Sequence, residues 1–119
     1  IRIRKIKDNR YYHVTEQAKT YIENHYMELD LSVEVIAREC GYSSYYFSRI
    51  FKELVGMNPV EYIKQIRIRE AKRRLEEQNI KVTDVAELVG YSNASNFYST
   101  FKKMVGMTPS EYKEFISKK

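Results

Sequence analysis

The 119-residue sequence has only one cysteine, Cys40, and only two prolines and four glycines. A single cysteine excludes an internal disulfide framework and a cysteine-rich zinc site, and it is typical of a protein in a reducing compartment. No apolar run approaches the roughly 20 residues that a helix needs to cross a bilayer, and no signal-peptide pattern opens the sequence. We therefore expect a soluble, cytoplasmic protein that does not enter a membrane.

Residue patterns for enzymatic chemistry are also missing. The two histidines, His13 and His25, are not spaced as a metal pair, no nucleophile or carboxylate pair stands in a recognisable setting, and there is no glycine-rich phosphate loop. Cys40, next to Gly41, is interpreted as a small buried hydrophobic residue at a helix end rather than as a redox sensor. The sequence predicts a protein that is not an enzyme and needs no cofactor or metal.

The balance of charge is basic, with 21 Lys and Arg residues against 16 Asp and Glu and a net charge of +5. A hydrophobic content of 43% is close to the globular average and argues against disorder. At roughly 100–150 residues per domain, the chain has room for one compact domain or two very small ones. A basic surface suits a polyanionic partner, although it also serves solubility alone.

All the glycines and prolines belong to an internal repeat. Residues 36–62 are echoed by residues 85–112, and both copies contain Gly-Tyr-Ser, Phe, Phe-Lys, Val-Gly-Met, Pro and Glu-Tyr in the same order. The second copy is longer by one residue, which lies between Ser92 and Phe97. Background composition would match only about two positions over such a window. The chain is therefore interpreted as a duplication.

Each copy predicts a short helix, a glycine turn, a second helix, a glycine stop and a third helix. In the first copy, Ser32 and Ser43 stand where they can cap the helices that follow. Glycine permits the left-handed conformation that ends a helix. The second helix of each copy has its apolar residues on one face. In the first copy this face consists of Phe47, Ile50, Phe51 and Leu54, and in the second copy the corresponding residues are Phe97, Thr100, Phe101 and Met104.

The remaining elements follow from caps and periodicity. Asn58-Pro59 opens a long connector helix over 59–76, and Thr108-Pro109 opens a terminal helix. Lys81 stands where Ser32 stood, so Thr83 is an alternative cap. Residues 15–26 predict one helix before the repeat. With seven helices and no convincing strand, the fold class is all-α.

A short helix joined through a glycine turn to an amphipathic helix is helix-turn-helix geometry, in which the second helix can lie in a DNA major groove. The polar stripe opposite the apolar face consists of Tyr45, Ser48, Arg49 and Lys52 in the first copy, and of Ser95, Tyr98, Ser99 and Lys102 in the second, with Asn93 and Ala94 near its start. Arg49 offers a forked donor for guanine, and Lys52 an ammonium for phosphate. A single stripe of this kind is more often a solvated face, but its recurrence favours DNA.

Helix length supports joint binding by both copies. The predicted connector is about 27 Å long, and successive major-groove faces lie about 34 Å apart. Provided that both polar stripes face the same way, one chain can place two helices in neighbouring grooves of an asymmetric site. Arg67 and other basic residues of the connector are candidates for phosphate contact, although Glu70 with Arg73 or Arg74 is equally an intrahelical pair.

The repeat resembles the DNA-binding domain of AraC/XylS-family transcription regulators over residues 15–117. The closest matches are Gly90-Tyr91-Ser92, Phe97, Phe101-Lys102, Gly106-Met107-Thr108-Pro109 and Glu111-Tyr112. The resemblance implies a homeodomain-like fold of two helix-turn-helix subdomains, sequence-specific binding to double-stranded promoter DNA, and transcription activation through contact with RNA polymerase. It also implies a separate N-terminal sensing or receiver domain, so we expect the C-terminal part of a longer regulator.

The resemblance divides the chain into a basic linker (1–14), a first helix-turn-helix subdomain (15–58), a connector helix (59–77) and a second subdomain (78–119). It implies base contacts by Tyr45, Ser48, Arg49, Ala94, Ser95, Tyr98 and Ser99. Phosphate contacts are expected from Ser43, Ser44, Tyr46, Lys52, Arg67, Asn93 and Lys102. Better-known activators place long polar residues in both reading helices, so the short side chains of the second one predict weaker base reading.

Two other binding functions remain open. A helical protein-interaction module could use the surface of the eleven tyrosines. RNA binding is less favoured, because the predicted fold offers no sheet with an aromatic platform. Salt dependence separates DNA binding from an aromatic protein interface, since neutralising phosphates releases counterions.

Overall fold

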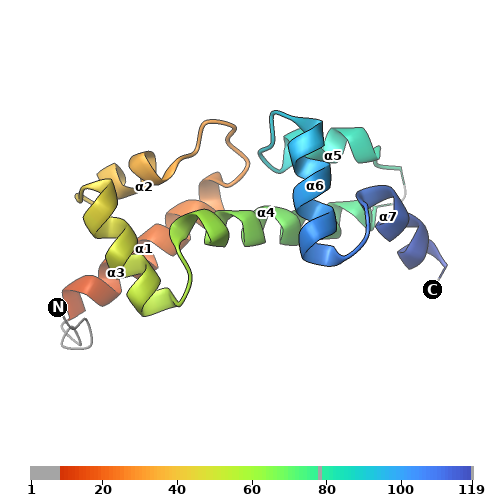
Figure 1. Cartoon of the computed structure of the whole chain (residues 1–119). Coiled ribbons are helices and arrows are strands. Elements are labelled where there is room, and N and C mark those ends of the chain that lie inside the picture. Colours follow the sequence, from red (N-terminus) through yellow and green to blue (C-terminus); the bar gives the residue numbers. More distant parts are fainter. Residues whose placement is uncertain (1–8, 78, 119) are drawn as a thin grey trace. The chain divides into compact units, whose positions relative to one another are not determined.

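A computed structural model describes residues 9–77 and 79–118 of the chain (Figure 1). These residues form seven α-helices and no strand, which confirms the all-α class. The helices are α1 (Asn9–His25), α2 (Val33–Glu39), α3 (Ser44–Val55), α4 (Pro59–Leu75), α5 (Val82–Leu88), α6 (Ala94–Val105) and α7 (Pro109–Ser117). The chain divides into two compact units. The first holds α1, α2, α3 and the start of α4 up to Ile63, and the second holds residues 26–30, the rest of α4, α5, α6 and α7.

The first helix starts earlier than the sequence prediction. We expected it to begin at Thr15, but α1 begins at Asn9, so residues 9–14 are helical rather than linker. The physical reason is packing, because Val14 is buried and continues the apolar face that Ala18 and Ile22 form at four-residue spacing. The rest of the predicted linker, residues 1–8, lies outside the described residues.

The core of the first unit lies where α1, α2 and α3 meet. Phe47 and Phe51 of α3 are fully buried, with ring centroids 5.7 Å apart. Phe51 also meets Tyr62 edge to face at 5.4 Å. The second unit repeats this arrangement, since Phe97 and Phe101 of α6 are fully buried there. The phenylalanines of both predicted apolar faces therefore lie in the cores, whereas Leu54 and Met104 at the far ends of these faces are 38% and 40% exposed.

Local capping explains most helix starts. Ser32 Oγ accepts a hydrogen bond from the amide of Val35, and Ser43 Oγ accepts one from the amide of Tyr46. At the start of α7, Thr108 and Glu111 cap each other reciprocally. The predicted glycine stops are also present, because Gly56 and Gly106 take left-handed backbone angles at the ends of α3 and α6.

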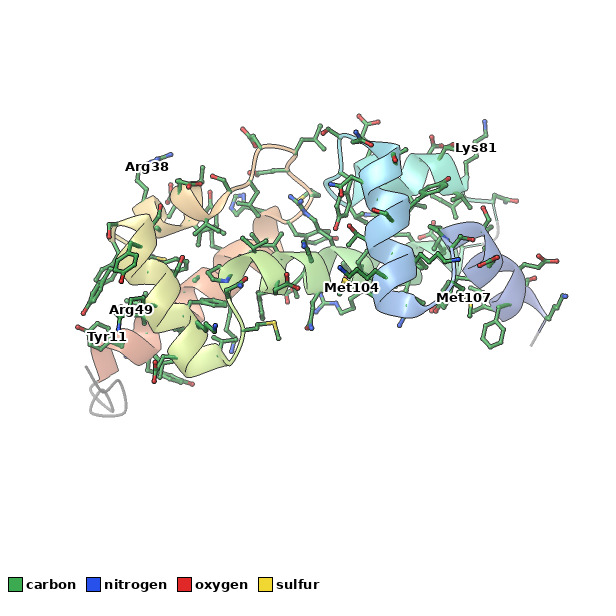
Figure 2. All side chains as sticks on the ribbon, viewed as in Figure 1. Tyr11, Arg38, Arg49, Lys81, Met104 and Met107 are labelled. Atoms are coloured by element: carbon green, nitrogen blue, oxygen red, sulfur yellow. The ribbon has the colours of Figure 1, made fainter. Side chains whose placement is uncertain are left out.

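Two starts in the second unit differ from the first. The residue before α5 is Lys81, which makes no side-chain cap and points away from the unit (Figure 2). The alternative cap, Thr83, is wrong because the helix has already begun at Val82. α6 is capped by Asn93, whose Oδ1 accepts from the amide of Asn96 at 3.0 Å. The extra residue of the second copy therefore lies in the turn before α6, not within the helix.

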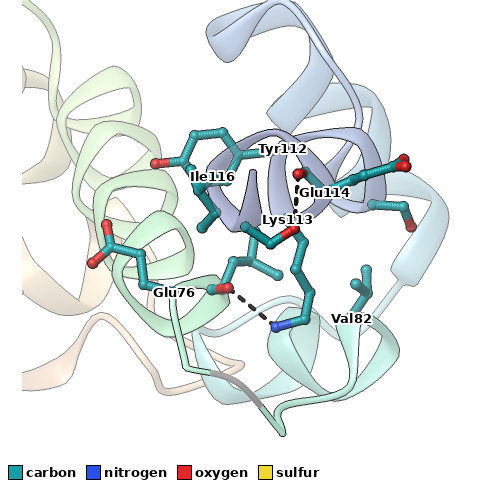
Figure 3. A pocket seen from close by; sticks show the side chains of 9 residues that line it. Glu76, Val82, Tyr112, Lys113, Glu114 and Ile116 are labelled. Atoms are coloured by element: carbon teal, nitrogen blue, oxygen red, sulfur yellow. Dashed lines mark hydrogen bonds between the residues drawn. The ribbon is translucent and has the colours of Figure 1, made fainter. Parts of the chain in front are cut away.

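The last helix is attached to the end of α4 by Lys113. Its Nζ donates to the carbonyl oxygens of Leu75, the last residue of α4, at 3.2 Å and of Glu77 at 2.7 Å. Lys113 helps to line a hollow of about 830 Å³ between the end of α4, the start of α5 and α7. Figure 3 shows Lys113 extending toward the end of α4. A cation at the C-terminal end of a helix is also favoured by the helix dipole.

Candidate nucleic-acid interface

The solvent face of α3 carries an arginine supported by a tyrosine. Tyr45 is 72% exposed, and the guanidinium carbon of Arg49 lies 5.8 Å from the centre of its ring. Arg49 Nη1 also donates to the Tyr45 hydroxyl at 3.4 Å. Arg49 is labelled on the surface of the first unit in Figure 2. α3 therefore presents the planar guanidinium of Arg49 as a forked hydrogen-bond donor, and Tyr45 restricts the orientations of this guanidinium.

The other predicted residues of α3 surround this pair. Ser48 is half-buried and Lys52 is exposed one turn further along. Arg49, Lys52 and Glu53 line a shallow hollow together. At the start of the helix, Ser43 is occupied as the cap, which places it beside the free amides of the first turn. Four of the predicted residues thus lie on one face of α3, namely Tyr45, Ser48, Arg49 and Lys52.

Tyr46 differs from the rest of this set because it is tied to α1. Its hydroxyl lies 2.7 Å from the hydroxyl of Tyr11, and the two rings meet edge to face at 6.2 Å. The Tyr46 ring also contacts Tyr42, with centroids 5.6 Å apart. The sequence prediction gave Tyr46 only a phosphate contact and missed this link. The link was missed because the sequence analysis placed Tyr11 in a linker, whereas Tyr11 lies in α1.

The corresponding face of α6 is polar but short. Ala94, Ser95 and Ser99 are exposed, and Ser99 Oγ donates to the carbonyl of Asn96 at 3.3 Å. Tyr98 is half-buried, with its ring edge to face against Phe97 at 5.8 Å. Lys102 is exposed in the last turn. This face offers hydroxyl groups, one aromatic ring and one ammonium, with no arginine.

Arg67 of α4 lies in a setting that the phosphate prediction did not anticipate. Its Nε donates to the carbonyl of Tyr26 at 2.8 Å, and its Nη2 donates to the carbonyl of Glu28 at 3.0 Å. The guanidinium also lies over the ring of Tyr91, 5.4 Å from its centre. Burial lowers the pKa of Arg67, and the nearby Tyr91 opposes that shift. Arg67 therefore has a structural role in the second unit.

The basic side of α4 is organised by one carboxylate. Glu70 is almost buried and accepts from Arg73 Nε at 2.8 Å and from Arg69 Nη2 at 2.9 Å. The intrahelical pair that the sequence left open between Arg73 and Arg74 is thus made by Arg73, with Arg69 as a second partner. Burial alone would raise the pKa of Glu70, but the hydrogen bonds from both arginines outweigh it and hold that pKa below its ordinary value.

The remaining candidate residues do not assemble into a chemical site. Tyr21 and His25 stack at 4.0 Å along α1. Cys40 is half-buried rather than buried as predicted, and burial raises the pKa of its thiol. Over residues 9–77 and 79–118, no group of three or more histidines, cysteines or carboxylates is placed to hold a metal ion. Within the same ranges, no helix is both long enough and apolar enough to span a bilayer.

Comparison with known proteins agrees with this arrangement. Residues 36–114 match a family model described as a helix-turn-helix domain. Over 94 residues the chain is 38% identical to the bifunctional transcriptional activator and DNA repair enzyme AdaA of Bacillus subtilis, a match that covers 79% of this chain and 44% of that protein. The chain spans less than half the length of the first curated relatives that it matches, and only 12% of one of them.

Solved structures share the fold. A transcriptional regulator from Chromobacterium violaceum, described as containing an AraC-type DNA-binding domain, has a TM-score of 0.77 at 25% identity, covering 87% of this chain and 91% of that one. The DNA-binding domain of the global transcriptional factor AdpA, solved in complex with a target DNA, has a TM-score of 0.79 at 25% identity, covering 84% and 89%. With its two glycine-stopped helices and their matched family model, the chain belongs to the AraC-type helix-turn-helix family of transcription regulators.

Proposed function

We propose that this chain is the DNA-binding part of a longer transcription regulator, and that α3 and α6 read neighbouring major grooves of one asymmetric duplex site. The observation that carries the proposal is the matched pair of polar faces. Each lies on a 12-residue helix that follows a glycine turn and buries two phenylalanines on its opposite side. The net charge of +5 and the likeness to a domain solved with its target DNA support it.

α3 is the stronger reader of the two. Arg49 can donate two parallel hydrogen bonds to guanine, which is the commonest specific contact in the major groove. Tyr45 holds the guanidinium near one orientation and can itself pack on a thymine methyl group or a sugar. Ser48 supplies a hydroxyl that serves either a base or a phosphate. Specificity in this half of the site therefore depends mainly on Arg49.

α6 reads bases through shorter groups. Ser95 and Ser99 do not extend far from the helix, so their contacts require close approach or a bridging water. Tyr98 is the longest side chain in this predicted set and is partly held by its packing on Phe97. Ala94 can contact a thymine methyl group. We expect looser base preference in this half of the site than in the half that α3 reads.

Phosphate contacts come from helix starts and from lysines. The amides near Ser43 and Ser44 in α3, and near Asn93 in α6, lie at helix N-termini, where the dipole favours anions. Lys52 and Lys102 add exposed ammonium groups. Tyr46 stays in the proposed phosphate set, although its hydroxyl also shares a hydrogen bond with Tyr11. Arg67 is not among the phosphate contacts that we propose, because two of its donor nitrogens already bond to carbonyl groups of the protein.

The length of α4 is compatible with neighbouring grooves. The helix has 17 residues, which corresponds to about 26 Å, against about 34 Å between successive major-groove faces. The difference is small enough for moderate bending of the duplex to absorb it. Because the two reading faces differ in chemistry, one chain needs no symmetric partner to recognise an asymmetric site.

The greater length of the curated relatives supports a further domain in the complete protein. We infer that this domain senses an effector or receives a phosphoryl group and controls the DNA-binding part. The relative named as a transcriptional activator supports an activating role, in which the bound regulator contacts RNA polymerase. Both proposals concern the whole protein and are tested with a longer chain.

The DNA proposal is tested by selecting bound duplexes from a random library and titrating the selected site with salt. We expect two unequal half-sites separated by about one helical turn, and binding that weakens steeply as salt rises. A single half-site would remove α6 from the reading set. No retained duplex, or binding without a salt dependence, would reject the proposal and favour a protein partner for the tyrosine-rich surface.

A further inference from the structure

The second unit contains a contact that the first unit lacks. Gly90, in the turn between α5 and α6, has a φ of +106°, and a Cβ built on it would lie 2.3 Å from the carbonyl oxygen of Tyr26 and 2.7 Å from Arg67 Nε. Gly41 holds the same place in the first unit with a φ of +83°, yet a Cβ there would meet nothing within 4 Å. Both glycines take the left-handed backbone conformation of the turn. Only at Gly90 does the absence of a side chain also leave room for the carbonyl of Tyr26 and the side chain of Arg67.

Arg67 is the centre of this contact. Its two hydrogen bonds reach the carbonyl groups of Tyr26 and Glu28, which belong to the segment of residues 26–30. The face of its guanidinium lies on the Tyr91 ring, so the same side chain contacts the segment and the turn. Hydrogen bonds from a charged donor are about twice as strong as neutral ones, and desolvation strengthens the contact with the ring.

The contact continues into the reading helix. Tyr91 is buried, and its ring centroid lies 5.4 Å from that of Phe97, the fully buried residue at the start of the apolar face of α6. The Tyr91 amide also bonds to the carbonyl of Ala86 in α5 at 2.9 Å. Arg67 is therefore connected to α6 through the side chain of Tyr91. The backbone amide of Tyr91 in turn holds this residue against α5.

We propose that Arg67 is a positioning residue for the second reading helix: it binds the segment of residues 26–30 and the Gly90-Tyr91 turn together and thereby sets the direction in which α6 leaves the turn, without touching DNA. This inference rests on the proposed function for its effect on base reading. We call the contacts of Arg67 with residues 26–30 and with the Gly90-Tyr91 turn the clamp, and the clamp is a property of the free protein. The existence of the clamp and its effect on base reading can therefore be tested separately.

The test compares Arg67→Gln with Arg67→Lys in the 119-residue chain. Glutamine removes both the positive charge and the forked arrangement of N–H donors. Lysine keeps the charge, but it has no planar group that can lie on the Tyr91 ring and bond to two carbonyl groups at once. Arg73→Gln is the matched control, because it removes an exposed arginine of the same helix that bonds to Glu70 and not to residues 26–30 or the turn. Tyr91→Phe and Tyr91→Leu complete the set, since phenylalanine keeps the aromatic face and leucine removes it.

Amide hydrogen exchange in the free protein tests the clamp. We expect exchange at the hydrogen-bonded amides of Gly90 and Tyr91 to accelerate about tenfold or more in Arg67→Gln, the effect of losing one charge-assisted hydrogen bond. Exchange at the corresponding amides of Gly41 and Tyr42 should not change, because no such contact supports that turn. Arg67→Lys and Tyr91→Leu should accelerate the same amides less strongly, and Tyr91→Phe and Arg73→Gln should not. Wild-type exchange in both Arg67 variants would overturn the proposal.

Base preference on the selected duplex tests the consequence for reading. We expect Arg67→Gln to relax preference only in the half that α6 reads, with the salt dependence of binding unchanged. A uniform loss of affinity with a salt slope reduced by about one would make Arg67 a phosphate contact and overturn the proposal. If glutamine unfolds the second unit, the lysine variant decides by the same two criteria. If the wild-type chain retains no duplex, the proposed function fails, and exchange alone decides whether the clamp exists.

Discussion

The hydroxyl groups of Tyr11 and Tyr46 lie 2.7 Å apart and join the early part of α1 to the first turn of α3. Tyr46 directly follows Tyr45, the exposed residue that supports Arg49. The position of the first turn of α3 is therefore coupled to the early part of α1.

We predict that Tyr11→Phe and Tyr46→Phe are coupled in a double-mutant cycle. Each substitution should lower the free energy of unfolding by about 0.5–1.5 kcal/mol, because it removes the hydrogen bond between the two hydroxyl groups, and the double variant should lose less than the sum. Urea denaturation measures all four proteins. Tyr12→Phe, at a 56% exposed neighbour, serves as the control and should be neutral. Strictly additive losses would show that the two hydroxyl groups do not interact.

Arg49→Ala should weaken binding to the selected duplex by about 1–3 kcal/mol and relax preference at one base position. The reason is the loss of a forked donor that Tyr45 holds in place. Competition binding against single-base variants of the duplex measures both effects. Arg38→Ala removes an exposed arginine from α2 and should leave base preference intact. Unchanged preference in Arg49→Ala would remove Arg49 from the reading set.

Tyr98→Ala should relax base preference in the half of the site that α6 reads. Tyr98 is the longest side chain of the predicted contact set on that face, and its packing on Phe97 limits its orientations. The same competition assay measures the change position by position. Ser110→Ala, at an exposed site in α7, is the control. An equal loss of affinity on every duplex would instead identify Tyr98 as a contact to the DNA backbone.

Phe51→Ala and Phe101→Ala should each destabilise their own unit by about 3–5 kcal/mol, because both rings are fully buried and leave a cavity. Leu54→Ala and Met104→Ala remove side chains from the same helices that are 38% and 40% exposed, and should cost much less. Thermal and urea unfolding followed by circular dichroism distinguish the pairs. Similar losses in the buried and exposed variants would contradict the assignment of the two cores.

Glu70 should make the second unit sensitive to acid. Because its pKa is lowered in the folded protein, its contribution to stability is present above the unfolded pKa of about 4.3 and disappears as pH falls through the folded value. Below about pH 4.3, the free energy of unfolding should therefore fall more steeply in the wild type than in Glu70→Gln. Urea titrations from about pH 6 to pH 3 measure the slopes. Glu87→Gln, at an exposed position on α5, should retain the wild-type slope.

Features that depend on neighbouring residues could be predicted from the sequence. Serine, asparagine and threonine caps located the starts of α2, α3, α4 and α7, and the glycine stops located the ends of α3 and α6. The spacing of Phe47 and Phe51 identified a buried face. The resemblance to the family rested on the same glycine and capping residues, together with the phenylalanines of the repeat. These signals are local because a cap is satisfied by an amide only two or three residues away.

Features that depend on distant segments could not be predicted in the same way. Arg67 looked like a basic residue on a basic helix, and nothing near it in sequence indicates carbonyl groups at residues 26 and 28. The start of α1 was missed because its charged surroundings outweighed Val14, which continues the buried spacing of that helix. Individual base and phosphate contacts remain predictions for both reading helices.

The placement of the extra residue in the second copy has a consequence for how the two copies diverged. An insertion within a helix would turn every following side chain by about 100° around the axis, and a buried phenylalanine would then point to solvent. The longer turn before Asn93 absorbs the change instead, so Phe97 and Phe101 keep the orientation of Phe47 and Phe51. The two copies can thus differ in length without turning either pair of phenylalanines away from its own core.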